Sequence, residues 1–352
     1  MNIPSYWQEH LNKKIEQIKA LQKRIGKNCV SFAMITDIHW GFNAQHSGAL
    51  LSKVMKECNI PFFFNGGDTF SGFAFCSKET IYQEVENFRK AFSEIEDRCL
   101  MVMGNHDATY TTKPYPEAIG NENMSKSEIA DCYFNFLKKY PNRTFGDDAY
   151  YFADDKEKKI RYIVLNTHDV PTDEKDEDGF AKYNSFRLFC IRQEQLEWFA
   201  HVALNVPSQE WSVVLCSHEN AATRAYQHRT HNNPLLVGII NAFKNHTSFS
   251  MKTQFEDEPF CDAEISVDYT DKGGNFIAWI SGHDHKDKLE VIDDITCIIT
   301  LHDAVRQDGG SYPTRILGTN TEHSFDVFLV DKAKRECKIV RVGYGEDREF
   351  TY

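Results

Sequence analysis

Met101-Val102-Met103-Gly104-Asn105-His106-Asp107 is the stretch of sequence that decides the fold. The apolar run Cys99 to Met103 predicts a buried parallel strand that stops at Gly104. Ligands of α/β sheets bind in the crevice outside the carboxyl ends of the strands, where Asn105 and His106 would then lie. An amide oxygen can bind a hard cation, and an imidazole can transfer protons near neutral pH. Because a turn alone could also explain these polar residues, the interpretation depends on the rest of the chain.

The same pattern of an apolar strand followed by polar side chains occurs four more times. Helices predicted over Gln45–Cys58 and Lys78–Asp97 separate the first three strands. This β-α-β-α-β order implies parallel strands with right-handed crossovers. The five strands are predicted over Cys29–Thr36, Ile60–Asn65, Cys99–Met103, Trp211–Cys216 and Asn275–Ile280.

The ends of these five strands carry side chains of the types that bind metals. Two of the groups have members two residues apart, which point to the same side in an extended segment. Each group alone would fit an ordinary loop, but five such strand ends are improbable by chance. The side chains are Asp37 and His39, Asp68, Asn105 and His106, His218, and His283 and His285.

The composition excludes several classes of protein. Hydrophobic residues make up 41% of the 352 positions, which is ample for a large core. The net charge of −12 argues against nucleic acid or an anionic membrane as the main partner. Bound metal cations could nevertheless supply the local positive charge that a small anion needs.

The cellular location follows from what the sequence lacks. No run of 18 apolar residues and no signal peptide is present, so no membrane span is expected. The ten cysteines are scattered without a CxxC pair, which is typical of reduced thiols. We therefore expect a cytoplasmic protein.

The predicted organisation is one large domain with two additions. Residues 1–28 contain a helix, Tyr6–Arg24, expected to pack on the domain, which covers residues 29–352. An insertion at about residues 219–264 holds one predicted helix, Leu235–Lys244, in an otherwise irregular polar segment. Long insertions next to a site are typically lids or specificity elements.

The remaining segments predict further helices and strands. Ala149–Phe152 and Arg161–Asn166 are expected to form a hairpin-like pair of strands. Further helices are predicted over Ser127–Leu137 and Gln193–Ala203, and further strands over Ile295–Leu301, Phe325–Val330 and Cys337–Val342.

The ordered motifs D-x-H, G-D, G-N-H-D, H and G-H-x-H resemble those of the calcineurin-like metallophosphoesterase family. The resemblance extends from Asp37 through His285 and includes all five blocks in order. It implies an α/β fold, a four-layer α/β/β/α sandwich of two mixed β-sheets flanked by helices. It also implies a dinuclear metal centre in which Asp68 bridges the two ions. By motif position, one metal would be held by Asp37, His39, Asp68 and His285, and the other by Asp68, Asn105, His218 and His283.

The activity implied by the resemblance is hydrolysis of a phosphoric ester bond. Mixed carboxylate, amide and imidazole ligands suit Mn, Fe or Zn. A metal-bridging hydroxide would be the nucleophile, and His106 would be the general acid that protonates the leaving oxygen. The expected substrate is a small phosphate ester, a phosphodiester more than a phosphomonoester.

Two alternatives remain open. A nuclease of the same family is disfavoured by the acidic charge and the lack of a basic run. A catalytically silent scaffold should have lost ligands or the acid, whereas this sequence retains them. The sequence does not indicate the oligomeric state.

The sequence departs from the protein phosphatases of the family. Their second block reads G-D-x-V-D-R-G, whereas here Ser71 stands where the Asp that orients the catalytic His would be, and the Arg is absent. The third block ends in Asp107 rather than Glu, as in small-substrate phosphodiesterases. Residues Val342–Tyr352 resemble poorly characterised bacterial and phage-borne members, so a phage-associated origin is an open hypothesis.

Four residues are candidates for substrate contact. Asn105 belongs to the metal-ligand set, and His168 follows the predicted strand Arg161–Asn166. Arg224 and Arg229 lie in the insertion, where a guanidinium could hold a phosphate oxygen.

Overall fold

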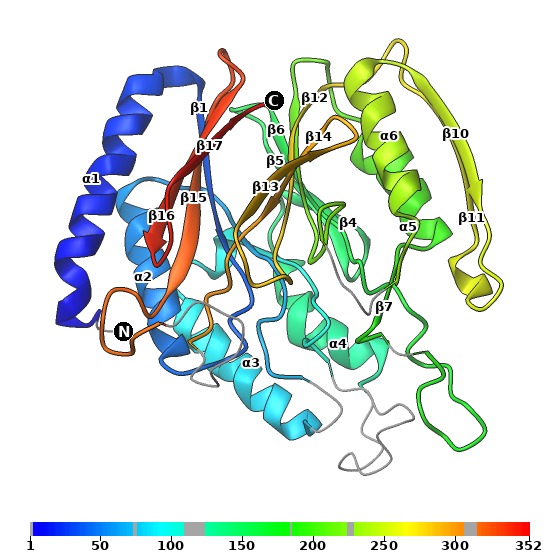
Figure 1. The fold of residues 1–352 in the computed structure, drawn as a ribbon, viewed down its shortest axis with the longest axis horizontal. Helices are drawn as coiled ribbons and strands as arrows, with labels where there is room; N and C mark the ends of the chain where they lie inside the picture. Colours follow the sequence, from blue (N-terminus) through cyan, green and yellow to red (C-terminus); the bar gives the residue numbers. More distant parts are fainter. Residues whose placement is uncertain (1–2, 73–75, 109–123, 184, 224–228, 306–314) are drawn as a thin grey trace.

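The computed structural model describes residues 3–72, 76–108, 124–183, 185–223, 229–305 and 315–352, with the backbone alone for residues 229 and 230. Two large β-sheets lie face to face, and helices cover the outer face of each (Figure 1). The predicted four-layer α/β/β/α sandwich is therefore confirmed. Among the described helices, none has the length and apolar character needed to cross a membrane.

The first sheet contains the three parallel strands predicted from the first third of the sequence. In spatial order its strands are β17 (Arg348–Thr351), β16 (Glu336–Gly343), β15 (Ser324–Asp331), β1 (Cys29–Ile35), β2 (Phe63–Asn65) and β3 (Cys99–Met101). β15 pairs antiparallel with β1 and extends the sheet into the C-terminal hairpins. β2 is shorter than predicted, because Pro61 has no N–H group to donate and regular pairing begins only at Phe63.

The second sheet is also mixed. In spatial order its strands are β13 (Lys288–Ile292), β14 (Ile295–Ile299), β12 (Asn275–Ser281), β8 (Ser212–Cys216), β6 (Ile160–Val164), β5 (Tyr150–Asp155) and β4 (Arg143–Asp147). The four central strands run parallel, and the edge strands are antiparallel to their neighbours. The predicted pairing of β5 with β6 is confirmed as antiparallel.

Helices from both halves of the chain cover the sheets. They are α1 (Gln8–Ile25), α2 (Ala44–Glu57), α3 (Lys78–Phe92), α4 (Lys126–Tyr133), α5 (Gln193–Trp198) and α6 (Asn233–Asn245), with short helical turns η1 (Ser5–Trp7), η2 (Gly26–Asn28), η3 (Glu96–Arg98), η4 (Asn135–Leu137), η5 (Phe199–Ala203) and η6 (Pro259–Cys261). α1, α2 and α3 lie against the first sheet, and α5 and α6 lie against the second (Figure 1). α1 buries Leu11, Ile15 and Ile18 at helical spacing, so it docks firmly on the domain.

The two faces of the second sheet belong to different hydrophobic cores. On β8, Val214 and Cys216 point into the core between the sheets. Val213 and Leu215, on the opposite face of the same strand, pack in a second core beneath α5 and α6. Burial on both faces explains the continuous apolar run that made this strand predictable.

The insertion contains more regular structure than the sequence predicted. Besides α6 it contains β10 (Ser248–Thr253), which forms a hairpin with β11 (Ala263–Asp268) at and beyond the predicted end of the insertion. It also contains β9 (Arg229–His231), which pairs with β7 (Leu188–Cys190). β10 is mostly exposed and polar, which removes the hydrophobic alternation on which strand prediction depends. β11 does alternate buried and exposed residues, a signal that could have revealed the hairpin.

Candidate metal centre

The carboxyl ends of β1, β2 and β3 in the first sheet meet those of β8 and β12 in the second. All seven predicted ligands, together with His106, lie within five residues of these strand ends. The first sheet supplies Asp37, His39, Asp68 and Asn105, and the second supplies His218, His283 and His285. They form two groups that share Asp68.

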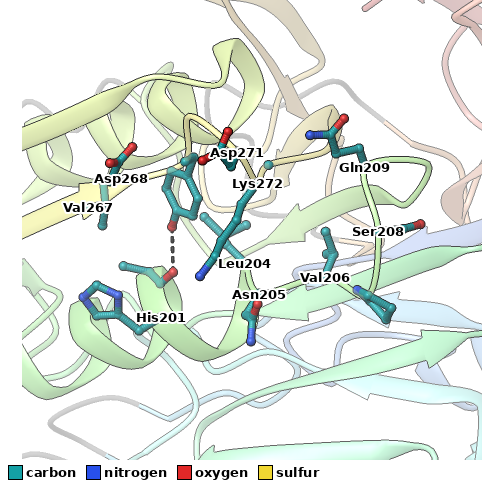
Figure 2. A pocket seen from close by; sticks show the side chains of 14 residues that line it. His201, Leu204, Asn205, Val206, Ser208, Gln209, Val267, Asp268, Asp271 and Lys272 are labelled. Carbon is teal, nitrogen blue, oxygen red and sulfur yellow. Dashed lines mark hydrogen bonds between the residues drawn. The ribbon is translucent and has the colours of Figure 1, made fainter.

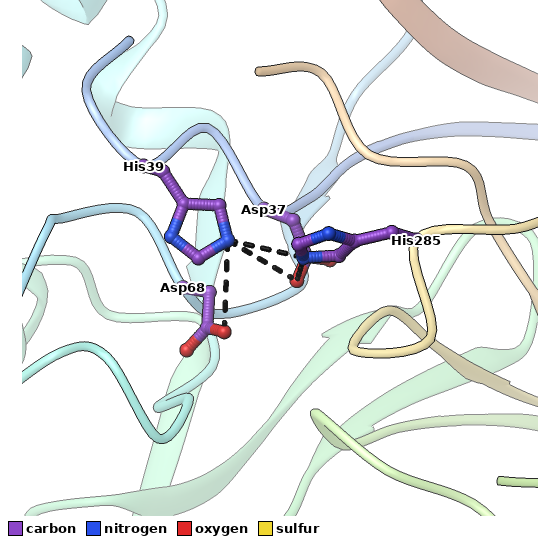
Figure 3. A group of neighbouring side chains, drawn as sticks. All are labelled: Asp37, His39, Asp68 and His285. Carbon is purple, nitrogen blue, oxygen red and sulfur yellow. Dashed lines mark hydrogen bonds and ion pairs between the residues drawn. The ribbon is translucent and has the colours of Figure 1, made fainter. Parts of the chain in front are cut away.

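Group A consists of Asp37, His39, Asp68 and His285, whose side chains point toward one another in Figure 3. His285 Nε2 lies 3.0 Å from Asp37 Oδ1 and 3.1 Å from His39 Nε2. His39 Nε2 lies 3.9 Å from Asp68 Oδ2. All four side chains are buried, and their candidate ligand atoms lie within 4.8 Å of one another.

Group B consists of Asp68, His218 and His283 with Asn105 beside them. His218 Nε2 lies 3.2 Å from Asp68 Oδ2 and 3.1 Å from Asn105 Oδ1. His283 Nδ1 lies 3.0 Å from the same Asn105 oxygen and 3.2 Å from His218 Nε2. The Asn105 oxygen and the two ring nitrogens therefore converge on one point.

The arrangement of lone pairs shows that the residues fit metal ions. His218 Nδ1 lies 2.8 Å from the carbonyl oxygen of Gly66, so this nitrogen carries the proton in the neutral ring. The lone pair of His218 Nε2 then faces the oxygens of Asn105 and Asp68. Such acceptors repel one another unless a cation or a proton lies between them. Carboxylate, amide and imidazole ligands together suit Mn, Fe or Zn.

The backbone is strained where it presents the ligands. Positive φ angles occur at Asp37 (52°), His39 (45°), Asp68 (50°), His283 (69°) and His285 (53°). Each non-glycine residue in this region costs about 1–3 kcal/mol, and such strain concentrates at functional sites. The strands therefore end in left-handed turns that bring these side chains back toward the groups.

Gly67 shows why glycine precedes Asp68. Its φ is +93°, and a Cβ at this position would lie 2.6 Å from Nδ1 of His218. A larger residue would therefore strain the turn and displace a candidate ligand.

Asp107 ties the loop after β2 to the loop after β3. Its buried carboxylate accepts hydrogen bonds from the N–H groups of Gly104, Asp68, Thr69 and Phe70, at 2.8–3.2 Å. Burial, with the nearby charge of Asp68, raises the pKa of Asp107 to about 7, against the opposing effect of these hydrogen bonds. Asp107 therefore fixes the backbone of Asp68, the residue that groups A and B share.

His106 lies beside group A with its ring partly exposed. Its ring centroid is 4.8 Å from that of His39 and 4.8 Å from that of Phe186. His106 Nδ1 lies 2.8 Å from the carbonyl oxygen of Gly72. This carbonyl supplies the orienting acceptor that the missing aspartate would have provided. Ser71 instead donates its hydroxyl to the backbone carbonyl of His39, at 2.5 Å.

The charges of Asp68 and His218 stabilise each other. Burial alone would raise the pKa of Asp68, but the imidazoles of His218, His106 and His39 outweigh it and hold the pKa well below its usual value. Burial would likewise lower the pKa of His218, yet the carboxylates of Asp68 and Asp37 raise it to about 10. Without a bound cation, a proton on His218 Nε2 therefore supplies the positive charge beside Asp68 that a metal ion would otherwise supply.

Glu219 is a residue of the centre that the sequence analysis missed. Its side chain is 1% exposed, and Oε1 lies 3.3 Å from His283 Nε2, the ring nitrogen that faces away from group B. Burial raises the pKa of Glu219 well above its usual value. Its position directly after His218 is a signal in the sequence, although the predicted insertion also begins at this residue.

Of the candidate substrate contacts in the second half of the sandwich, His168 lies beside group B. His168 is buried, and its ring centroid lies 5.6 Å from that of His218. His168 also lines a cavity of about 430 Å³. Arg224 lies outside the described residues, and only the backbone of Arg229, in β9, is described.

A second pocket, shown in Figure 2, is remote from the centre. It has a volume of about 260 Å³ and contains residues directly before β8 and β12, among them Gln209 and Gly273. The centre follows the opposite ends of these two strands, about 20 Å away at 3.3 Å per residue. None of the predicted site residues lines this pocket.

Comparison with known proteins identifies the family. The sequence profile of the calcineurin-like phosphoesterases matches residues 30–287. No curated protein matches the sequence.

Among solved structures, the fold is similar to that of a dimetal phosphatase from Danio rerio, with a TM-score of 0.57 at 12% identity, covering 92% of this chain and 99% of the other. A second similar structure, described as GAP50, the anchor in the inner membrane complex of Plasmodium, has a TM-score of 0.46 at 13% identity and coverages of 92% and 89%. The profile match extends over most of the chain and contains both ligand groups, and this chain therefore belongs to the calcineurin-like phosphoesterase family.

Proposed function

We propose that this protein hydrolyses small phosphate esters at groups A and B, with phosphodiesters preferred over monoesters and His106 as the general acid. The observation that carries the proposal is the placement of His106, partly exposed beside the candidate ligands of groups A and B. Two bound cations would neutralise the phosphoryl oxygens and activate the attacking water.

The hydrogen bond at Nδ1 defines which ring nitrogen of His106 would release a proton to the substrate. With Nδ1–H donating to the Gly72 carbonyl, a protonated ring has its second proton on Nε2, the atom that would pass it to a leaving oxygen. After the transfer, the neutral ring keeps the Nδ1 proton and its hydrogen bond. The backbone N–H of His106 also donates to Asp68 Oδ1 at 2.7 Å, which fixes the acid relative to the shared ligand.

The preference for diesters is supported by the cavity of about 430 Å³ that His168 and Asn166 line. A diester carries a second substituent that needs such a space. Apolar side chains form part of the wall, and carboxylates form another part. Lys126 and Arg192 also line the cavity and pair with Asp147 and Asp169. The carboxylates outnumber these two cations, so the cavity favours a neutral or cationic substituent over a polyanion. The residues are Met103, Ile129, Phe134 and Val170 in the apolar part, and Asp147, Asp148, Asp169, Asp173 and Glu174 in the acidic part.

The test compares substrates with the Mn²⁺-loaded protein. We expect faster hydrolysis of bis-p-nitrophenyl phosphate than of p-nitrophenyl phosphate, and cyclic nucleotides and glycerophosphodiesters extend the series. Asp68→Asn should abolish the activity and serves as the control. Cleavage of DNA or RNA alone would instead identify a nuclease, and metal binding without turnover of any ester would identify a scaffold.

A further inference from the structure

A third cluster of metal-ligand side chains lies outside groups A and B and shares no residue with them. His46 belongs to α2, and Glu322 and His323 directly precede β15. His46 Nδ1 lies 3.5 Å from Glu322 Oε1, and His323 Nε2 lies 3.7 Å from the same oxygen. The three candidate ligand atoms lie within 4.8 Å of one another. We name these residues group C.

His323 points an unshared lone pair into group C. Its Nδ1 lies 3.2 Å from both carboxylate oxygens of Asp303, so this nitrogen carries the proton of a neutral ring. The remaining nitrogen, Nε2, is buried and has no hydrogen-bond partner among the described residues, and the side chain is 1% exposed. A histidine whose remote N–H donates to a carboxylate is the usual arrangement of a metal-binding histidine.

His46 also directs a ring nitrogen without a hydrogen-bond partner toward Glu322. Its Nδ1 is buried and likewise has no hydrogen-bond partner in the described part of the chain. The distances of 3.5 and 3.7 Å to Glu322 are too long for good hydrogen bonds. They are close to the separation of about 3.3–3.6 Å between two ligands of a tetrahedral metal with bonds of about 2.0–2.2 Å.

Glu322 is fixed as an ionised carboxylate. Oε1 accepts hydrogen bonds from the Tyr6 hydroxyl at 2.8 Å and from Trp7 Nε1 at 3.0 Å. Oε2 accepts from Asn43 Nδ2 and from the N–H of Gly318, both at 2.9 Å. Burial would raise the pKa of Glu322, but these donors outweigh it and lower the pKa. The oxygen that faces both histidines therefore carries negative charge and is held in position.

We propose that group C is a third metal site, which binds Zn²⁺ through His46 Nδ1, Glu322 Oε1 and His323 Nε2. On binding, the rotatable hydroxyl of Tyr6 turns away from Oε1, which leaves one lone pair of this oxygen for the metal. Two imidazoles and one carboxylate are a ligand set typical of zinc, with a water molecule as the fourth ligand. Zinc here would join α2 to the segment before β15. Through Glu322 it would also secure η1, whose Trp7 keeps its hydrogen bond to Oε1. The role of the site is therefore structural, independent of the proposed hydrolysis.

The test is the zinc content of the full-length protein. Wild type, His46→Gln and the control His201→Gln are saturated with ZnSO₄, passed through a desalting column and analysed by mass spectrometry. His201 is a half-exposed histidine outside all three groups. We expect three Zn²⁺ per chain for wild type and His201→Gln, and two for His46→Gln. Equal zinc content in wild type and His46→Gln would overturn the proposal.

A second measurement separates group C from groups A and B. In Asp68→Asn, which lacks the shared ligand of groups A and B, Zn²⁺ should still raise the midpoint of thermal unfolding. Adding His46→Gln to Asp68→Asn should remove this residual shift. If Zn²⁺ has no effect on Asp68→Asn, a proton rather than a metal bridges His323 and Glu322, and the proposal is wrong even where the hydrolytic activity of wild type is confirmed.

Discussion

Asp68 is the residue on which both groups of candidate ligands depend, because it belongs to group A and to group B. We expect Asp68→Asn to lower Mn²⁺ content and kcat more than His39→Ala does. The first substitution removes a negative charge between two cation positions, whereas the second leaves group A three ligands. Metal analysis and kcat of the two variants measure the difference. Equal metal content and equal rates would show that Asp68 is not shared.

His106 has a role that a series of leaving groups can test. General acids contribute typically about 10²–10⁴-fold, so His106→Asn should lower kcat/KM by this factor for alkoxide leaving groups. The loss should be smaller for p-nitrophenolate, which leaves without a proton. Metal content should stay near that of wild type, because His106 belongs to neither group. A uniform loss across the series, or the loss of one metal, would assign His106 another role.

Glu219 is expected to act through His283 rather than on the substrate. A cation bound at group B would favour the ionised form of Glu219 despite its burial. Loss of a carboxylate that accepts from the remote nitrogen of a metal-binding histidine typically costs about 10–100-fold in metal affinity. Glu219→Gln should therefore weaken Mn²⁺ binding by this factor and restore much of the activity at saturating Mn²⁺. Calorimetric titration of Mn²⁺ measures the affinity. An unchanged affinity with reduced kcat would argue instead for a direct role in the reaction.

At the scale of elements, α3 supports the loop that carries Asp68. Glu84, on α3, accepts a hydrogen bond from the N–H of Ser71 at 2.8 Å. Burial raises the pKa of Glu84 to about 7, despite the opposing hydrogen bonds from Ser71. Between its ordinary pKa and about 7, the folded state holds a proton that the unfolded state has released. The stability that this proton contributes is therefore lost as the pH rises through this range.

Glu84→Gln should remove this pH dependence. The amide keeps an acceptor for the Ser71 N–H and carries no charge to bury. We expect the variant and wild type to unfold at the same urea concentration near pH 4, and the variant to be the more stable at pH 8. Glu79→Gln, an exposed change on the same helix, is the matched control. A stability difference that is independent of pH would contradict this account of Glu84.

At the scale of the whole molecule, the candidate centre joins the two sheets. Groups A and B each take ligands from both sheets, so a bound cation would cross-link the two inner layers. Binding to the folded state alone stabilises it by about 2.7 kcal/mol at a ligand concentration 100 times Kd. We expect Mn²⁺ to raise the thermal midpoint of wild type and a chelator to lower it. Asp68→Asn should show little response to Mn²⁺, and an equal response in both proteins would contradict the cross-link.

The sequence alone determined most of the architecture and the residue types of the candidate centre. The order of apolar runs and helices predicted the parallel strands β1, β2 and β3, and each strand end displayed its polar residues directly. These are local features, because burial on both faces of a strand leaves a continuous apolar run. Where burial is one-sided or slight, as in β10, the local signal fails and the strand was missed.

Only the tertiary structure decided which distant residues meet. The backbone carbonyl of Gly72 orients His106. Because every residue has a backbone carbonyl, the sequence does not indicate which one accepts this hydrogen bond. Glu219 lies beside His283, which follows a different strand. His46 lies beside Glu322, which is 276 residues further along the chain. Such contacts follow from how two sheets and their helices pack, since packing brings together side chains whose separation along the chain carries no information about their distance in space.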